Sequence, residues 1–227
     1  MITIRNDFTV EQLNKISEIS HSFGISAELA KILFARGIDD NAKVERFLHP
    51  GKSNFYNPFL LSGMKDAVAR ITAARDNGER ILVFGDYDAD GVCASTVMKK
   101  ALAEFGVEEV YAVVPERSQG YGLTHDLVEK VLEKYYPDLL ITVDCGISCK
   151  DEVDFIQDVG VDVIVTDHHE IPEQIPDCTV INCKLREQEY PCDYLCGAGV
   201  AYKVAYALIG ERANKYLDLV TLATIAD

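Results

Sequence analysis

Short apolar segments alternate with helix-like segments through most of this chain, and few folds accommodate that order. The apolar segments are rich in Val, Ile and Leu, and they cover residues 81–85, 110–114, 139–143 and 161–166. Helix-like segments separate them at 92–104, 127–135 and 151–159, and a fifth short strand is predicted at 179–182. Continuous apolar strands that alternate with helices are typical of a parallel sheet buried on both faces. We therefore predict an α/β fold with a doubly wound, mainly parallel sheet of five strands.

The region before the first predicted strand has a different character. Apolar residues recur at helical spacing through residues 9–49, and a Gly-, Asn- and Pro-rich stretch at 50–58 is typical of a connector. An amphipathic helix is predicted at 64–77, and helices at 199–209 and 213–226 close the chain. These patterns predict two parts. The first is a helical N-terminal extension with its connector (1–58), and the second is an α/β domain (59–227).

The charge of the chain argues against a protein that grips nucleic acid by itself. The 227 residues include 22 Lys and Arg against 37 Asp and Glu, which gives a net charge of −15. Proteins that neutralise nucleic-acid phosphates unaided carry basic patches. No apolar run approaches the ~20 residues of a membrane span, and the N-terminus lacks the layout of a signal peptide. We therefore expect a protein with no membrane association.

The cysteine pattern indicates a reducing compartment. The chain has seven cysteines, an odd number, and no export signal, which favours free thiols in the cytoplasm over a disulfide framework. Two pairs with C-x3-C spacing, Cys145/Cys149 and Cys192/Cys196, fall within the loose range of zinc ligands. Neither pair is flanked by a glycine-rich knuckle, so buried free thiols are the favoured interpretation and a zinc or iron–sulfur site is the alternative.

Acidic residues and histidines follow three of the predicted strands. Ligands of doubly wound sheets lie beyond the carboxyl ends of the strands, which meet at one edge. The residues found there are Asp86 and Asp88 after the first strand, Asp144 after the third, and Asp167, His168 and His169 after the fourth. Alternation along the first strand lets Asp86 and Asp88 point the same way. Several carboxylates at one site repel one another unless a cation neutralises them, so this edge is predicted to bind metal.

The donor set also indicates which metals and which chemistry. Mixed carboxylate and imidazole ligands suit Mn²⁺ or Mg²⁺ and tolerate Zn²⁺ or Co²⁺. Two such ions bridged by a carboxylate are a recurrent device for phosphoester hydrolysis. The D-x-D-x-D-G run also resembles the start of an EF-hand loop, but Val97 stands where that loop needs glutamate. Helix capping by the acidic residues is the other alternative.

Two further segments are candidates for phosphate contacts. Arg117 follows the second predicted strand, and Gly120 and Gly122 nearby permit close backbone approach. The alternative is a turn with a surface arginine. Residues 196–200, which include Gly199, resemble a helix N-terminus whose amides could hold an anion. Tight helix–sheet packing through small residues explains that segment equally well.

Four motifs in order resemble those of the DHH phosphoesterase superfamily. They are GDYDADG (85–91), VDCGIS (143–148), TDHH (166–169) and TIAD (224–227). The helical lead with ARGI (35–38) and FLHP (47–50), together with GYG (120–122) and GAGV (197–200), is similar to the RecJ branch of single-strand exonucleases. Leu82 stands where pyrophosphatase-type members carry a histidine, so a simple pyrophosphatase is a less favoured interpretation.

The resemblance implies roles for individual residues. Two Mn²⁺ or Mg²⁺ ions would be bridged by Asp144, with Asp86 on one ion and Asp88, His168 and Asp227 on the other. His169 would face the scissile phosphate or support the ligands, and Arg117 would hold a substrate phosphate. Asp90 and Asp167 would be supporting residues, Asp167 by orienting the histidine pair.

The resemblance also implies the substrate and the partners. The expected activity is two-metal 5′→3′ hydrolysis of single-stranded DNA in repair and recombination, with a helicase and a single-strand-binding protein as possible partners. The second domain of the superfamily and an oligonucleotide-binding domain are not in the sequence, so we expect a catalytic part with weak activity alone. An oligoribonuclease, a nucleotide phosphatase or a cyclic-dinucleotide phosphodiesterase is the first alternative. A non-catalytic RecJ-like binding module is the second.

Overall fold

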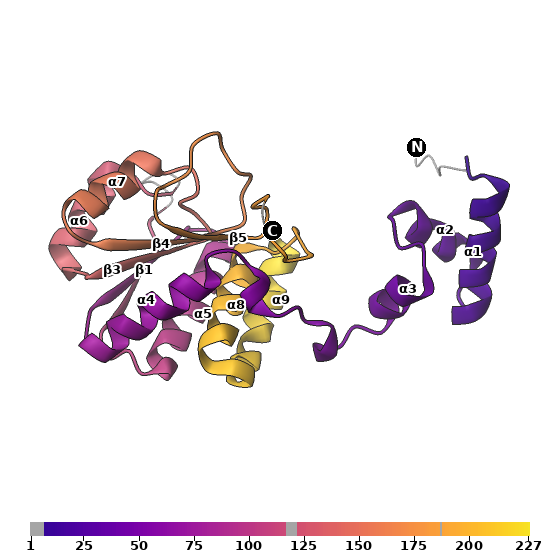
Figure 1. Cartoon of the computed structure of the whole chain (residues 1–227), viewed down its shortest axis with the longest axis horizontal. Coiled ribbons are helices and arrows are strands. Elements are labelled where there is room, and N and C mark those ends of the chain that lie inside the picture. The colour runs from indigo at the N-terminus through magenta and orange to yellow at the C-terminus, as the bar shows by residue number, and fades with distance from the viewer. Residues whose placement is uncertain (1–6, 117–121, 187) are drawn as a thin grey trace. The chain divides into compact units, whose positions relative to one another are not determined.

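The computed structural model describes residues 7–116, 122–186 and 188–227. The chain divides into two compact units, Met1–Phe55 and Tyr56–Asp227. Figure 1 shows the helical unit and the α/β unit in colours that follow the chain.

The first unit is built from three helices with strong local signals. They are α1 (Val10–Phe23), α2 (Ala27–Ala35) and α3 (Asn41–Leu48), followed by the 3-10 turn η1 (Lys52–Asn54). Thr9 and Gln12 form a capping box at the start of α1, and Gly24 ends that helix in the left-handed conformation (φ 62°). The core of the unit is a small cluster: Ile16, Ile19, Ala30, Leu33 and Val44.

The second unit contains the predicted sheet. Its five strands are all parallel in the order β2-β1-β3-β4-β5. The bounds are β1 (Ile81–Gly85), β2 (Val110–Val113), β3 (Leu139–Val143), β4 (Asp162–Asp167) and β5 (Thr179–Asn182). The predicted fold class is therefore confirmed. The fourth strand starts one residue later than predicted because the Val161 amide donates to the Ile156 carbonyl at the end of the preceding helix.

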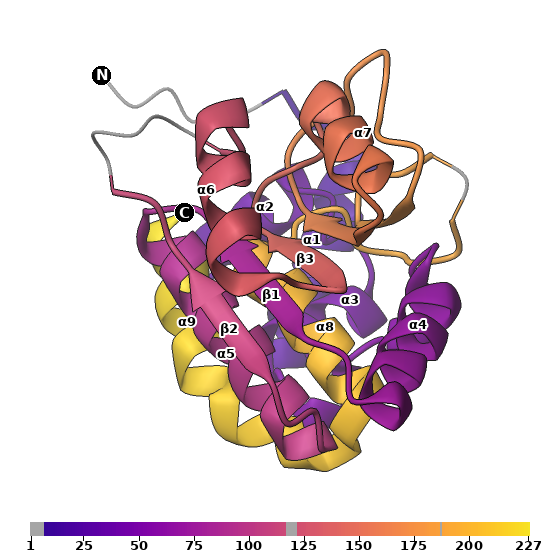
Figure 2. The ribbon, with the colours of Figure 1, turned by 90° about the vertical axis from the view of Figure 1, so that its left-hand side faces the viewer.

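Helices cover both faces of the sheet, as Figures 1 and 2 show. Those of the α/β unit are α4 (Met64–Asn77), α5 (Ala89–Phe105), α6 (His125–Tyr135), α7 (Lys150–Asp158), α8 (Gly197–Ile209) and α9 (Leu217–Ala226), with 3-10 turns η2 (Pro58–Leu60) and η4 (Gly210–Tyr216). One face packs on α4, α5, α8 and α9 through Ile81 and Val83, and the other on α6 and α7 through Leu82 and Phe84. Alternate residues of β1 thus enter two separate cores.

Several helix boundaries differ from the predicted ones. α5 begins at Ala89, three residues early, because the Asp88 side chain caps it by accepting from the Gly91 amide at 2.9 Å. The predicted helix at 213–226 is split, since η4 runs to Tyr216 and α9 begins only at Leu217. Within the described residues, no helix is long and apolar enough to cross a bilayer.

Candidate metal centre

The end of β1 places one carboxylate in an unusual environment. Asp86 directly follows the strand and is only 1% exposed, yet neither of its carboxylate oxygens has a hydrogen-bond donor in bonding geometry among the described residues. Burial raises the pKa of Asp86, and the backbone amides of Tyr87 and Gly122 only partly oppose that shift. Burying a carboxylate that lacks hydrogen-bond donors costs folding free energy. This side chain is therefore suited to bind a ligand that the protein itself does not supply, such as a cation.

The end of β3 contributes the carboxylate at the middle of the cluster. Asp144 adopts the left-handed conformation (φ 61°), which is uncommon for residues other than glycine but tolerated by Asp. Its side chain is buried, and Oδ1 lies 3.0 Å from Nε2 of His168. A Cβ atom on Gly197 would overlap the Asp144 carboxyl group. Only glycine at position 197 therefore leaves room for this carboxylate.

The end of β4 holds the two histidines through Asp167. Oδ1 of Asp167 accepts from the His168 amide (2.7 Å) and the His169 amide (3.1 Å), and Oδ2 accepts from the Ile147 amide (2.9 Å). Nδ1 of His169 lies 2.7 Å from Oδ1 of the same carboxylate. Burial opposes ionisation of Asp167, but these donors lower its pKa overall. Its acceptors are thus used by the protein, as expected of a residue that orients its neighbours.

Three groups of possible ligand atoms lie at this edge of the sheet, and within each group the atoms are within 4.8 Å of one another. They are Asp86–Asp88–Asp144, Asp144–His168–His169 and Asp90–His168–Asp227. Asp144 and His168 each belong to two groups, so the groups form one continuous cluster. Here Asp88 lies with Asp86 and Asp144, whereas the family resemblance implies an ion shared by Asp88, His168 and Asp227; that assignment stays a prediction.

Burial and mutual repulsion dominate the electrostatics of the cluster. Burial raises the pKa of Asp144 to about 7, with contributions from Asp90 and Asp88 and with His168 opposing. Burial alone would lower the pKa of His168, but its contact with Asp144 raises it overall. The hydrogen bond to Asp167 raises the pKa of His169. In the absence of a cation the site therefore retains protons, which a divalent ion would displace on binding.

Asp90 differs from its neighbours because the protein satisfies it. It is 2% exposed and accepts hydrogen bonds from the Gly197 amide (2.6 Å) and the Ala198 amide (2.7 Å) at the start of α8. The anion at this helix N-terminus is thus a side chain of the chain itself, and a phosphate bound there would have to displace it. Gly199 is buried in the first turn of α8, beside Leu195 and Cys196. Its predicted phosphate contact stays untested.

The predicted phosphate-binding segment is only partly described. Arg117 and Gly120 lie outside the described residues. Gly122 is buried with φ 71°, and its amide lies close enough to Asp86 to lower the pKa of that carboxylate. The structure therefore brings Gly122 to the β1 end of the cluster.

Gly197 is the residue of the site that sequence reasoning missed. The GAG sequence at 197–199 signals close packing, but the partner of that packing, Asp144, lies more than fifty positions away. All seven cysteines are free, and none takes part in a group of metal ligands among the described residues.

Comparison with known proteins agrees with this geometry. The family model described as "DHH family, N-terminal domain" matches residues 80–224. The single-stranded-DNA-specific exonuclease RecJ of Bacillus subtilis (strain 168) is 36% identical over 215 residues, which cover 94% of this chain and 27% of that protein. The chain thus spans about a quarter of the length of this curated relative.

Two of the solved structures with similar folds are RecJ proteins with bound manganese. RecJ from Thermus thermophilus in complex with Mn²⁺ matches with a TM-score of 0.75 and 31% identity, over 95% of this chain and 30% of that one. A crystal structure of exonuclease RecJ bound to manganese matches with a TM-score of 0.64 and 38% identity, over 74% of this chain and 43% of that one. Together with the family match, these similarities confirm the resemblance noted in the sequence: the chain belongs to the DHH family.

Proposed function

We propose that this chain is the catalytic part of a metal-dependent 5′→3′ exonuclease acting on single-stranded DNA. The observation that carries the proposal is the buried Asp86 carboxylate, which has no donor in bonding geometry in the described part of the chain and lies in one cluster with Asp144 and His168 at the edge of the sheet. The relatives support the substrate, since they are single-stranded-DNA-specific exonucleases and their solved structures hold Mn²⁺ or Mg²⁺.

The residues present fit two divalent cations of the Mn²⁺ or Mg²⁺ type. Asp86, Asp88, Asp144, His168 and Asp227 would hold them, and Asp144, which belongs to two ligand groups, is suited to lie between them. When bound, such ions lower the pKa of a water molecule and draw charge from the phosphoryl oxygens. Asp90 stabilises the start of α8, so that Gly197 stays against Asp144.

His169 is the candidate for contact with the substrate. Its Nδ1 lies 2.7 Å from Oδ1 of Asp167, which fixes the orientation of the ring beside the cluster. The side chain is 42% exposed, and its raised pKa favours the protonated ring. Nε2 can therefore donate a hydrogen bond to a phosphate oxygen or a proton to the departing oxygen.

The division of the chain and its setting are part of the proposal. Residues 59–227 would form the catalytic domain, and 1–58 the helical lead; the compact units, which meet at Phe55 and Tyr56, support a boundary nearby. Seven free cysteines support a cytoplasmic protein. Roles in DNA repair and recombination, with a helicase and a single-strand-binding protein as partners, follow from the RecJ similarity.

Metal binding and polarity can be tested together. We expect the chain to bind Mn²⁺ in calorimetric titration and to shorten single-stranded DNA whose 3′ end is blocked by phosphorothioates, but not DNA blocked at its 5′ end. Asp144→Ala should abolish both metal binding and cleavage. Unchanged Mn²⁺ binding and cleavage by that variant would contradict the proposal, and degradation of dinucleotides alone would favour a small-nucleotide phosphodiesterase.

A further inference from the structure

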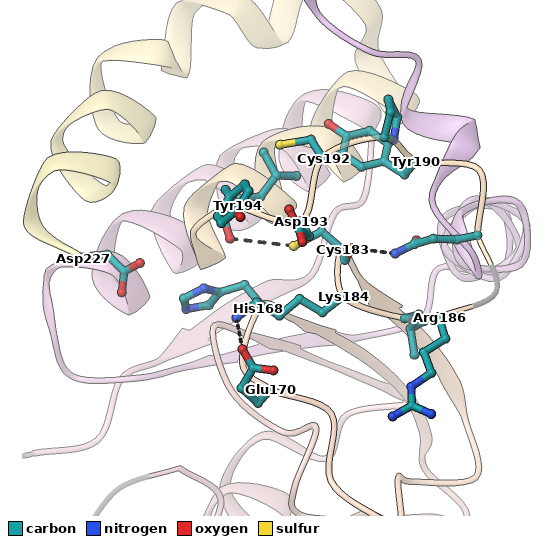
Figure 3. Close-up of a pocket in the computed structure, with 14 residues that line it drawn as sticks. His168, Glu170, Cys183, Lys184, Arg186, Tyr190, Cys192, Asp193, Tyr194 and Asp227 are labelled. Atoms are coloured by element: carbon teal, nitrogen blue, oxygen red, sulfur yellow. Dashed lines mark hydrogen bonds and ion pairs between the residues drawn. The ribbon is translucent and has the colours of Figure 1, made fainter. Parts of the chain in front are cut away.

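A groove of ≈ 880 Å³ opens beside the metal centre, along the loop that follows β5. The groove loop comprises residues 183–186 and 188–195. In the view of Figure 3, His168 and Asp227 lie at one end of the groove and Arg186 at the other. Clefts of about 300–1,000 Å³ hold organic ligands of many atoms, so the groove has room for more than one phosphate group.

The groove loop is fixed although it forms no helix or strand. Nε2 of Gln188 donates to the Asn182 carbonyl (3.1 Å) and the Cys183 carbonyl (2.6 Å), and the Lys184 amide donates to Oδ1 of Asn182 (2.8 Å). Tyr190 is buried edge-to-face against Tyr56, with ring centroids 5.8 Å apart. The backbone of this loop is therefore anchored at several points before a ligand arrives, which lowers the entropic cost of binding.

Tyr194 is such a side chain. It lines the groove only four positions from the buried Tyr190, yet it is 87% exposed. Among the described residues, no aromatic ring or cation stacks on it. An exposed ring beside a phosphoesterase centre offers a flat surface on which an unstacked base can lie.

The charges of the groove suit a nucleotide better than those of the chain as a whole. Apart from His168 and Asp227, the charged lining residues are Lys184 and Arg186 against Glu170 and Asp193, a balanced set in a chain of net charge −15. Lys184 lies 2.9 Å from Glu170, whereas Arg186 is exposed and has no ion-pair partner in the described part of the chain. A free guanidinium is suited to bidentate contact with a phosphate.

We propose that this groove binds the nucleotide next to the scissile phosphate, with its base on Tyr194 and its phosphate at Arg186. The inference rests on the proposed nuclease function and adds the origin of strand selectivity. A base can lie on Tyr194 only when its face is uncovered, as in a single strand, whereas bases of a duplex are stacked on one another.

The test separates base stacking from phosphate contact. Binding of oligo(dT) and of an abasic oligomer of equal length is measured by fluorescence anisotropy in an Asp144→Asn background, where the strands stay intact. Tyr194→Leu should weaken oligo(dT) binding by about 5- to 100-fold and leave abasic binding unchanged. Arg186→Gln should weaken both and lower the slope of log K against log salt by about 0.7.

Two exposed residues elsewhere serve as matched controls. Tyr136 is 69% exposed and precedes β3, at the opposite edge of the sheet, and Asn tolerates its positive φ. Arg36 is exposed at the end of α2. Tyr136→Asn and Arg36→Gln should bind both oligomers as the background does.

The outcomes distinguish this inference from the proposed function. Three outcomes would each overturn the proposal that the groove binds a nucleotide. They are oligo(dT) binding that Tyr194→Leu does not change, an equal loss of binding for the abasic oligomer, and no binding by the Asp144→Asn background. Mn²⁺-dependent hydrolysis of bis(4-nitrophenyl) phosphate, a diester without a base, tests the metal centre separately. This hydrolysis should persist in Tyr194→Leu. Its absence in the parent chain would overturn the proposed phosphoesterase function, whereas the binding data would still test nucleotide binding in the groove.

Discussion

Asp86, directly after β1, and Asp90, in the first turn of α5, are four residues apart and both buried, but their hydrogen bonding is opposite. Asp90 is 2% exposed and accepts hydrogen bonds from two backbone amides of α8, whereas Asp86 is 1% exposed and has no donor in bonding geometry within residues 7–116, 122–186 and 188–227. The Asp90 carboxylate joins α5 to α8. The Asp86 carboxylate is buried at a cost in folding free energy, in a place where a cation can bind it.

The difference teaches how a chain can be rigid around a site and still leave it reactive. Asp167 belongs with Asp90, because its oxygens are used by three backbone amides and by His169. Asp144 belongs with Asp86, because burial raises its pKa to about 7. Satisfied carboxylates thus frame the unsatisfied ones, and the two kinds should respond differently to substitution.

The largest effect is expected at Asp86. Asp86→Asn removes a metal ligand, so Mn²⁺-dependent hydrolysis of bis(4-nitrophenyl) phosphate should fall by about 10²- to 10³-fold. Because no donor is lost, the free energy of unfolding of the metal-free chain, measured in urea with EDTA, should change by less than about 1 kcal/mol. A large loss of stability with activity retained would reverse our comparison.

Asp90→Asn should show the opposite pattern. An amide cannot accept from both the Gly197 and Ala198 amides as a carboxylate does, so the free energy of unfolding should fall by about 2–3 kcal/mol. Urea unfolding in EDTA measures this loss. Asp126→Asn, in the exposed first turn of α6, is the control and should stay within about 0.5 kcal/mol. If Asp90→Asn were as stable as the parent, Asp90 would not be the structural carboxylate.

The pH dependence of stability provides a third test. The pKa values of Asp144 and His168 are raised in the folded chain, so the folded state binds more protons than the unfolded state above pH 4. Stability of the metal-free chain is then highest at the acidic end and falls as the pH rises from 5 through about 7, by on the order of 2–3 kcal/mol. Unfolding in EDTA between pH 5 and 8 measures this trend.

Saturating Mn²⁺ is the matched condition for that experiment. Metal binding displaces the protons, so the fall in stability between pH 5 and 8 should shrink or reverse. Stability of the metal-free chain that rises with pH across this interval would show that the buried carboxylates are satisfied by the protein after all.

Asp88 should show a small loss of stability together with a loss of metal binding, because it belongs to both kinds. It is exposed and caps α5 through the Gly91 amide, and it also lies in a ligand group with Asp86 and Asp144. Asp88→Ala should lower the free energy of unfolding in EDTA by about 1 kcal/mol, and Asp88→Ser, which can still cap, should lower it less. Equal Mn²⁺ binding by Asp88→Ser and the parent would show that only the cap matters.

Much of the fold could be predicted because its signals are local. Three of the five strands have the predicted bounds, since apolar runs such as 81–85 and 139–143 are followed directly by an aspartate, which does not continue an apolar strand. Boundaries set by distant or capping contacts were displaced. α5 starts early because of the Asp88 side chain, and β4 starts late because Val161 bonds to the helix before it.

By itself the sequence determined the parallel sheet and the set of acidic residues and histidines at its carboxyl edge. The spacing of apolar residues and the alternation of strand and helix segments along the chain are local properties of the sequence. Only the tertiary structure decided which carboxylates the protein satisfies and which it leaves for a cation. Asp90 meets Gly197, and Asp144 needs the space beside that same glycine, across more than fifty residues of chain. Hydrogen-bond satisfaction depends on such approaches between distant segments, and no local pattern encodes them.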